Sequence, residues 1–144
     1  MLVRDVLQSK GRRIVTIDCE ATVSEAIAKL VQNNIGSLPV VDHDKKLIGI
    51  FSERDVLRVI HNKGENFARM PVCDVMTRDP ITCNLDDDVE HVMGFMSDRR
   101  IAKVPVTAGD ELVGIVSVGD VIKALHEKLS HENQHLLSYI HGAV

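Results

Sequence analysis

One pattern written twice along the chain constrains the fold more than any other feature. Residues 14–44 fall on residues 80–110 when the sequence is shifted by 66, and after one residue drops out of the next turn the offset becomes 65. The superposed pairs include Thr16 and Thr82, Pro39 and Pro105, Gly49 and Gly114, Ser52 and Ser117, and Asp55 and Asp120. Because self-similarity at a fixed period indicates a repeated structural unit, we expect one unit built twice.

The repeat also predicts the domain organisation. The first copy covers residues 1–62, including a leader helix at its N-terminus, and the second copy covers residues 71–129. Both copies begin with a similar leader, "VRDVL" and "VCDVM", and the first copy has three extra residues before its first strand. A polar linker at 63–70 joins the copies, and residues 130–144 are expected to form a helical tail.

Each copy has the element order strand, helix, strand, strand, helix. Strand-like runs at 13–17 and 80–83 precede helices with apolar residues at helical spacing, and a capping box at Thr22 and Glu25 opens the first helix. Two apolar runs joined by a polar turn follow, then a second helix. One unit of roughly 50 residues can hardly bury its sheet alone. We therefore predict an α/β (α+β) fold of two β-α-β-β-α repeats packed sheet to sheet in a pseudo-twofold arrangement, plus a C-terminal helix.

Composition narrows the function classes. Hydrophobic residues make up 44% of the chain and charged residues 26%, as in ordinary globular proteins. The net charge of −4 and the lack of a basic, aromatic-rich stripe argue against nucleic-acid binding. No apolar run suits a signal peptide or a membrane span, so we expect a cytoplasmic protein without membrane contact. Three cysteines without a C-x-x-C pair indicate reduced thiols.

The stretches "SERD" and "SVGD", which end the last apolar run of each copy, allow two interpretations. Ser52 with Asp55, and Ser117 with Asp120, have the spacing of a helix cap, and a duplicated fold duplicates its caps. A helix start also offers free N–H groups to an anion, and a carboxylate one turn along can accept hydrogen bonds from a ribose diol. The spacing alone leaves cap and nucleotide site open.

The doubled pattern resembles the cystathionine-β-synthase (CBS) domain pair, also called a Bateman module, of the stand-alone bacterial type. The resemblance covers residues 2–129 and rests on "h-P-V-V-D" and "h-h-G-h-h-S-x-x-D", where h is an apolar residue, and on the lead "MTRDPITC" into the second copy. It implies two clefts between the sheets that bind AMP, ADP, ATP, S-adenosylmethionine or NAD(H). It also implies a homodimer of two modules.

The resemblance implies the roles of individual residues. Asp55 and Asp120 take the ribose hydroxyls, Ser52 and Ser117 contact phosphate or ribose, and the first strands and pre-proline segments frame the adenine. The full expected set is Val15, Thr16, Ile35, Ser37, Leu38, Pro39, Ser52, Arg54, Asp55, Ile81, Thr82, Arg100, Ile101, Lys103, Val104, Pro105, Ser117, Gly119 and Asp120. Some family members carry a basic residue two positions before the proline, which is Lys103 in the second copy but Ser37 in the first.

Differences between the copies predict that the two clefts are not equivalent. Arg54 could pair with phosphate, or it is a solvated residue of the first helical turn; Gly119 replaces it in the second copy. Two basic clusters allow either a polyphosphate ligand or plain solvation of a helix end. These clusters are Arg99, Arg100 and Lys103 in the second copy, and Lys10, Arg12 and Arg13 in the first.

The tail carries a zinc-protease-like motif, "HENQH" at His131–His135. So short a match on a polar tail has a high false-positive risk, and a catalytic site needs a third ligand and a cleft. We therefore expect no metal site, although His126, His131 and His135 could bind a metal adventitiously. Leu129, Leu136, Leu137 and Ile140 instead predict an amphipathic helix that packs on the core or on a partner subunit.

The sequence therefore predicts a ligand sensor for signal transduction without catalytic residues or a catalytic cofactor. Its ligand would be a small adenine nucleotide, its assembly a homodimer, and its downstream protein partner is not specified by the sequence. The alternative is a ligand-free structural dimerisation module in which Ser52 and Ser117 are only caps. A metal-dependent hydrolase that uses "HENQH" is a third, remote hypothesis.

Overall fold

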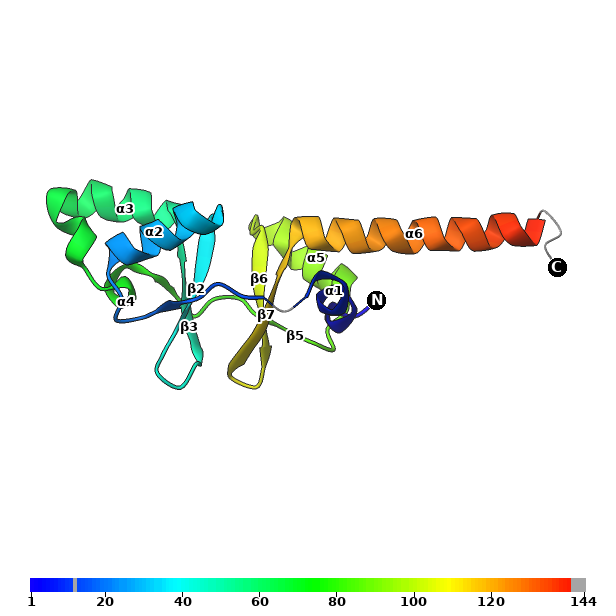
Figure 1. Cartoon of the computed structure of the whole chain (residues 1–144), viewed down its shortest axis with the longest axis horizontal. Coiled ribbons are helices and arrows are strands. Elements are labelled where there is room, and N and C mark those ends of the chain that lie inside the picture. Colours follow the sequence, from blue (N-terminus) through cyan, green and yellow to red (C-terminus); the bar gives the residue numbers. More distant parts are fainter. Residues whose placement is uncertain (12, 141–144) are drawn as a thin grey trace.

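The computed structural model describes residues 1–11 and 13–140 of the chain. The two copies form separate lobes, and the C-terminal helix extends away from them (Figure 1). The elements are α1 (Val3–Lys10), β1 (Ile17–Asp18), α2 (Val23–Asn33), β2 (Ser37–Val41), β3 (Leu47–Ser52), α3 (Glu53–Lys63), the 3-10 helix η1 (Gly64–Arg69), α4 (Val72–Val75), β4 (Thr77–Arg78), β5 (Cys83–Asn84), α5 (Val89–Arg99), β6 (Lys103–Ala108), β7 (Glu111–Ser117) and α6 (Val118–Ile140).

Two small mixed sheets confirm the predicted fold class. The first has the strand order β1-β2-β3-β4 and the second the order β5-β6-β7. In both, the first strand runs parallel to the next, and the following hairpin is antiparallel. The hairpin turns of the two lobes touch, because Lys46 forms an isolated bridge with Glu111. The repeated pattern has therefore folded as one unit built twice.

The leader segments cross between the copies. Val3, Val6 and Leu7 of α1 are buried in the core of the second copy, with β6, β7 and α5. Val72 and Met76, which begin the second copy in sequence, are buried in the core of the first. Strand β4 then adds to the first sheet by pairing with β3. Each lobe is thus completed by the leader of the other, and each has its own hydrophobic core.

The repeated glycine of the second hairpin strand makes room for the crossing leader. A Cβ on Gly114 would lie 2.7 Å and 2.9 Å from the two methyl carbons of Leu7. A Cβ on Gly49 would lie 2.5 Å from the Met76 sulfur and 2.8 Å from the Thr77 carbonyl oxygen. Real Cβ atoms do not approach that closely. Glycine at these two positions therefore lets a buried leader side chain lie directly on the strand.

The first strand of each copy is shorter than the sequence indicates. We predicted strands at 13–17 and 80–83, but ladder pairing begins only at Ile17 and at Cys83. The preceding residues form the passage from a leader on one lobe to the sheet of the other, so they have no strand beside them (Figure 1). Pro80 in addition lacks an N–H to donate. The polar linker expected at 63–70 mostly forms η1.

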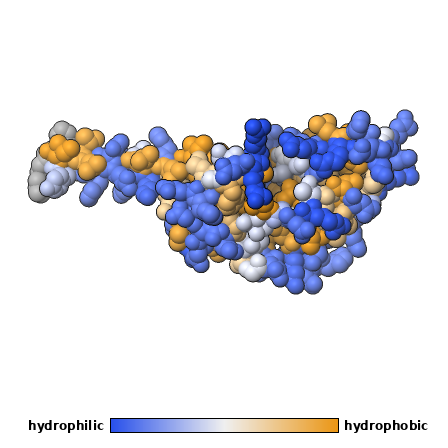
Figure 2. Space-filling view, turned by 180° about the vertical axis from the view of Figure 1, so that it is seen from behind, coloured by the Kyte–Doolittle hydropathy of each residue, from blue (hydrophilic) through white to orange (hydrophobic). Residues whose placement is uncertain are grey.

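Helix α6 continues directly into the tail as a single helix of 23 residues. Its projecting end carries Leu129, Leu136 and Leu137, which are 61%, 56% and 53% exposed. Figure 2 shows apolar side chains along this projecting end. These leucines do not pack on the core of their own chain. Of the two arrangements that we expected, packing on the core is therefore wrong, and packing on a partner subunit stays a prediction. Residues 141–144 of the expected tail lie outside the described residues. No described helix combines the length and the apolar character needed to cross a membrane.

Candidate functional site

Both Ser-x-x-Asp stretches form the helix caps that the sequence allows. The Asp55 backbone N–H donates to the Ser52 hydroxyl at 3.4 Å, and the Ser52 N–H donates to Asp55 Oδ2 at 2.9 Å. In the second copy the corresponding distances are 3.0 Å and 2.9 Å, between Asp120 and Ser117. Two donors left free at each helix start are thereby satisfied reciprocally. The cap interpretation is confirmed, and it leaves part of each carboxylate for other partners.

Sheet register brings the pre-proline residues next to the helix starts. Ser37 pairs with Ser52, and Lys103 pairs with Ser117, as cross-strand partners. One residue further out, the first helical N–H of α3 donates to the Gly36 carbonyl and that of α6 to the Ala102 carbonyl. The basic residue that we expected only in the second copy therefore lies directly beside the Ser117 cap.

The two carboxylates have different surroundings. Asp55 is only 2% exposed. Its Oδ1 accepts hydrogen bonds from Arg58 and from the Thr77 hydroxyl, both at 3.1 Å. Its Oδ2 accepts from the Ser52 backbone N–H and hydroxyl. Both oxygens are occupied by the protein itself, so a diol could reach Asp55 only after Thr77 or Arg58 moved. The role of Asp55 in ligand binding stays a prediction.

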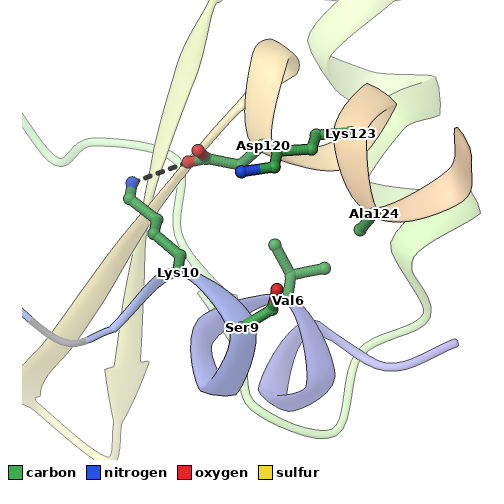
Figure 3. A pocket seen from close by; sticks show the side chains of 6 residues that line it. All are labelled: Val6, Ser9, Lys10, Asp120, Lys123 and Ala124. Carbon is green, nitrogen blue, oxygen red and sulfur yellow. Dashed lines mark hydrogen bonds and ion pairs between the residues drawn. The ribbon is translucent and has the colours of Figure 1, made fainter. Parts of the chain in front are cut away.

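Asp120 instead lines an open pocket between α1 and α6 (Figure 3). Its side chain is 22% exposed, and its Oδ2 accepts a hydrogen bond from the Lys10 ammonium at 2.6 Å. The ammonium also donates to the Ile115 carbonyl at 2.9 Å. The pocket has a volume of about 180 Å³ and is lined by Val6, Ser9, Lys10, Asp120, Lys123 and Ala124. Among the described residues, no hydrogen bond to Asp120 Oδ1 is found.

The electrostatics of the pocket keep this carboxylate charged. Partial burial opposes ionisation, but the hydrogen bond from Lys10, together with those from Ser117, outweighs it and lowers the pKa of Asp120. A carboxylate with two lysines beside it can accept hydrogen bonds from vicinal hydroxyls, and the lysines can receive a phosphate. The pocket therefore suits a sugar phosphate better than a neutral or cationic ligand.

The other expected contact residues lie at or near the surface of the two lobes, with some of them in the cores. Arg54 and Arg100 are exposed, and Val15, Thr16 and Ile81 are half-buried. Leu38, Pro39, Val104 and Pro105 are buried within their strands, so their side chains are core and only their backbone could face a ligand. Gly119 is exposed, with only the Ser117 hydroxyl near the position of a Cβ, at 3.7 Å. Arg12 lies outside the described residues.

Sequence reasoning placed Lys10 in a basic cluster but did not connect it with Asp120, and it missed Lys123, Ser9 and Val6. These residues meet only because α1 crosses to the second lobe. The repeat itself offered one signal, since the leader "VRDVL" is matched by a leader that directly precedes the second copy. A leader that recurs before each unit is consistent with an exchange between units, but spacing alone does not distinguish exchange from local packing.

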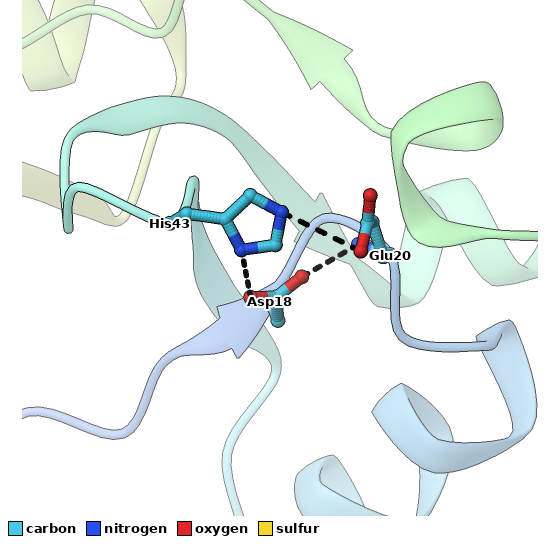
Figure 4. Close-up of side chains that lie close together, drawn as sticks. All are labelled: Asp18, Glu20 and His43. Atoms are coloured by element: carbon cyan, nitrogen blue, oxygen red, sulfur yellow. Dashed lines mark hydrogen bonds and ion pairs between the residues drawn. The ribbon is translucent and has the colours of Figure 1, made fainter.

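A second polar cluster lies at the far end of the first sheet (Figure 4). His43, in the β2–β3 turn, is 3.5 Å from Glu20 through Nε2 and 4.0 Å from Asp18 through Nδ1. These three side chains could together ligate a cation, but all are exposed, and such groups are common without an ion. Among the described residues no comparable group includes His131 or His135, so the "HENQH" motif has no third ligand there.

A doubled α/β unit with exchanged leaders, and a polar pocket between the crossing helix α1 and helix α6, defines a class of tandem-repeat modules. A family model described as the CBS domain matches residues 3–62 and 72–127. The chain therefore belongs to the CBS-domain family, as the motifs indicated.

Solved and curated relatives support this assignment over most of the chain. The mitochondrial CBS domain-containing protein CBSX3 of Arabidopsis thaliana is 34% identical over 97% of this chain and 72% of its own length. The crystal structure of the CBS-domain protein ATU1752 from Agrobacterium tumefaciens has a TM-score of 0.78 at 34% identity, covering 85% of this chain and 92% of that one. The CBS domain pair of MJ0100, solved with 5-methylthioadenosine and S-adenosyl-L-methionine, has a TM-score of 0.74 at 32% identity, covering 89% and 98%.

Proposed function

We propose that the protein is a non-catalytic regulatory module that binds an adenine nucleotide between the leader helix of the first repeat and the last helix of the second. The observation that carries the proposal is the pocket at Asp120, in which a charged carboxylate faces two lysines. The ligand is AMP, ADP, ATP or NAD(H), with S-adenosylmethionine as a further adenosine-containing candidate. Support comes from MJ0100, whose CBS domain pair was solved with two adenosine derivatives. Binding of the nucleotide changes how the protein interacts with a partner, and the nucleotide itself is not converted.

Binding at Asp120 can act on the whole module because the pocket joins elements from both ends of the chain. Lys10 and Asp120 are 110 residues apart in sequence, and α1 is buried against the second lobe. A ligand that prefers one placement of α1 would shift the module toward that placement. We place this sensor in the cytoplasm, and a fractionation of the native cells tests that location.

A homodimer is part of this proposal, and apolar surface favours it. An open groove of about 560 Å³ lies between α2 and α3. It is lined by Ile27, Leu30, Val31, Asn34, Ile35, Glu53, Val56 and Leu57. Val31 and Leu57 are 74% and 69% exposed, which is costly for a lone molecule in water. The same surface favours the second candidate function, a structural dimerisation module without a physiological ligand.

Thermal unfolding with a ligand panel separates the two functions. A ligand present at 100 times its Kd should add about 2.7 kcal/mol to the folded state. We expect a phosphate-containing adenine nucleotide to raise the Tm, and Asp120→Asn to abolish that rise. Asp55→Asn, measured beside it, tests whether the enclosed carboxylate of the first copy also takes part in binding. A flat panel with AMP, ADP, ATP, NAD(H) and S-adenosylmethionine would favour the structural module.

A further inference from the structure

We propose that Lys10 is a built-in counter-ion for Asp120 that makes the pocket selective for phosphorylated ligands. In the ligand-free protein the Lys10 ammonium binds the Asp120 carboxylate. When a nucleotide binds, its ribose diol takes the place of the ammonium at Asp120, and its phosphate becomes the new partner of the ammonium. A nucleoside without phosphate has to displace the same ammonium and gives it no new partner. This inference rests on the proposed function and assigns the selectivity of its site.

The geometry shows why a diol and Lys10 compete. Asp120 Oδ2 already accepts from the Ser117 N–H and from Lys10, at 2.9 Å and 2.6 Å. A diol that hydrogen-bonds both carboxylate oxygens therefore meets the ammonium at Oδ2. The cap bond from Ser117 belongs to the helix start and remains in place. Lys10 is the partner that can leave, because its side chain is 35% exposed and flexible.

The size of the pocket agrees with a displaceable side chain. Its volume of about 180 Å³ is below the roughly 300–1,000 Å³ of pockets that hold a whole small molecule. Lys10 spans the pocket from α1 toward Asp120 on α6 (Figure 3). Movement of this one side chain opens the carboxylate and widens the cavity, whereas Lys123 stays at the rim as a second cation for phosphate.

The first copy does not have this device. Lys10 corresponds to Asp79 when the leaders are superposed, since "VRDVL" begins at residue 3 and "VCDVM" at residue 72. In its place, the Thr77 hydroxyl and Arg58 bind Asp55, whose side chain is 1% exposed. Arg58 is a cation and its side chain is 56% exposed, but its departure would leave the Thr77 hydroxyl on the same carboxylate oxygen, and Asp55 would stay enclosed. We therefore expect the exchange of a cation for a ribose diol at Asp120 and not at Asp55.

Calorimetric titration of adenosine and AMP tests the inference. The wild-type protein should bind AMP more tightly than adenosine. In Lys10→Met, adenosine should bind more tightly because Asp120 is free, and AMP more weakly because a phosphate partner is lost. Each change is expected to be about two- to fivefold, as for a partly exposed ion pair, so the AMP preference falls about fourfold or more. Lys10→Arg keeps the charge and should keep the preference.

Controls make every outcome informative. Lys128→Met removes the same charge from an exposed position further along α6 and should change neither affinity. Lys10→Gln is measured beside Lys10→Met, so the result does not depend on the folding of one variant. An unchanged AMP preference in both variants would overturn the role of Lys10 while the proposed function stands. If neither adenosine nor AMP binds to the wild type or to the variants, this inference falls, whereas the proposed function fails only if the whole ligand panel is flat.

Discussion

The exchange of leaders between the copies can be measured as a pairwise coupling energy between Leu7 and Gly114. Leu7 is 1% exposed, so Leu7→Ala should lower the free energy of unfolding by about 2–5 kcal/mol. Gly114→Ala should cost about 1–3 kcal/mol, as overpacking does, because the new methyl group meets buried atoms. The three atoms nearest to that methyl group all belong to the Leu7 side chain, at 2.7, 2.9 and 3.4 Å.

The double variant should therefore be more stable than the sum of the two costs. In the Leu7→Ala background the colliding atoms are gone, and the alanine at Gly114 partly fills the cavity. The coupling should match the single cost of Gly114→Ala, about 1–3 kcal/mol, in the stabilising direction. Backbone effects of replacing glycine are the same in both backgrounds and cancel in the cycle.

Urea unfolding followed by circular dichroism, at one fixed protein concentration, gives the four free energies. The matched control is the cycle between Leu7 and Gly49, the equivalent glycine of the first copy, which touches Met76 instead. That cycle should be additive within about 0.5 kcal/mol. Coupling between Leu7 and Gly49, with none to Gly114, would mean that α1 packs on its own copy and would refute the exchange.

Three further predictions concern the carboxylates and the tail. In urea unfolding, Asp55→Asn should cost about 1–3 kcal/mol, because a buried amide cannot accept hydrogen bonds from all the donors around Asp55. Asp120→Asn should cost about 1 kcal/mol or less, because Asp120 is partly exposed. Equal costs would contradict the difference in burial. Carboxyl NMR should show the pKa of Asp120 below its ordinary value of 3.8 and moving upward in Lys10→Met. Since the pKa of Asp120 is lowered in the folded state, the stability that its ionisation provides is present above about pH 4 and is lost as the pH falls through the folded pKa. A pKa that does not move in Lys10→Met would show that Lys10 is not the partner of Asp120. Removal of residues 130–144 should change the unfolding free energy of the monomer by less than about 0.5 kcal/mol, because the buried residue of α6 is Val121, which the truncation keeps. A larger loss of stability at high protein concentration would show that a second copy covers the apolar side chains of the projecting end.

The sequence predicts the units of this fold better than it predicts their assembly. Local signals decided the hairpins and caps: the apolar runs around Pro39 and Pro105 became β2 and β6, and Ser52 and Ser117 became caps. These features depend on neighbours within a few residues. The placement of α1 on the second lobe depends on contacts across more than a hundred residues, which no local pattern encodes.

In the candidate site too, the sequence predicts the local features but not the contacts that the assembly of the copies creates. Asp55 and Asp120 are equivalent in sequence, but each crossing leader supplies a different hydrogen-bond partner, Thr77 to Asp55 and Lys10 to Asp120. We predicted unequal clefts from Arg54 and Gly119 and from Ser37 and Lys103, and those pairs stay predictions about the ligand. The difference that the structure adds lies in the leaders, where the two copies have unlike side chains after a similar start.

The exchanged leaders also set the order in which the chain can complete its lobes during synthesis. The first lobe lacks Met76 and β4 until the ribosome has made the start of the second copy. Helix α1, although made first, finds its binding surface only when β7 and Val121 have emerged. Closing so long a loop is entropically unfavourable and slow, so α1 stays without its partner until the second copy has been made. A nascent chain that stalls within the second copy would therefore expose Val3, Val6 and Leu7 to chaperones.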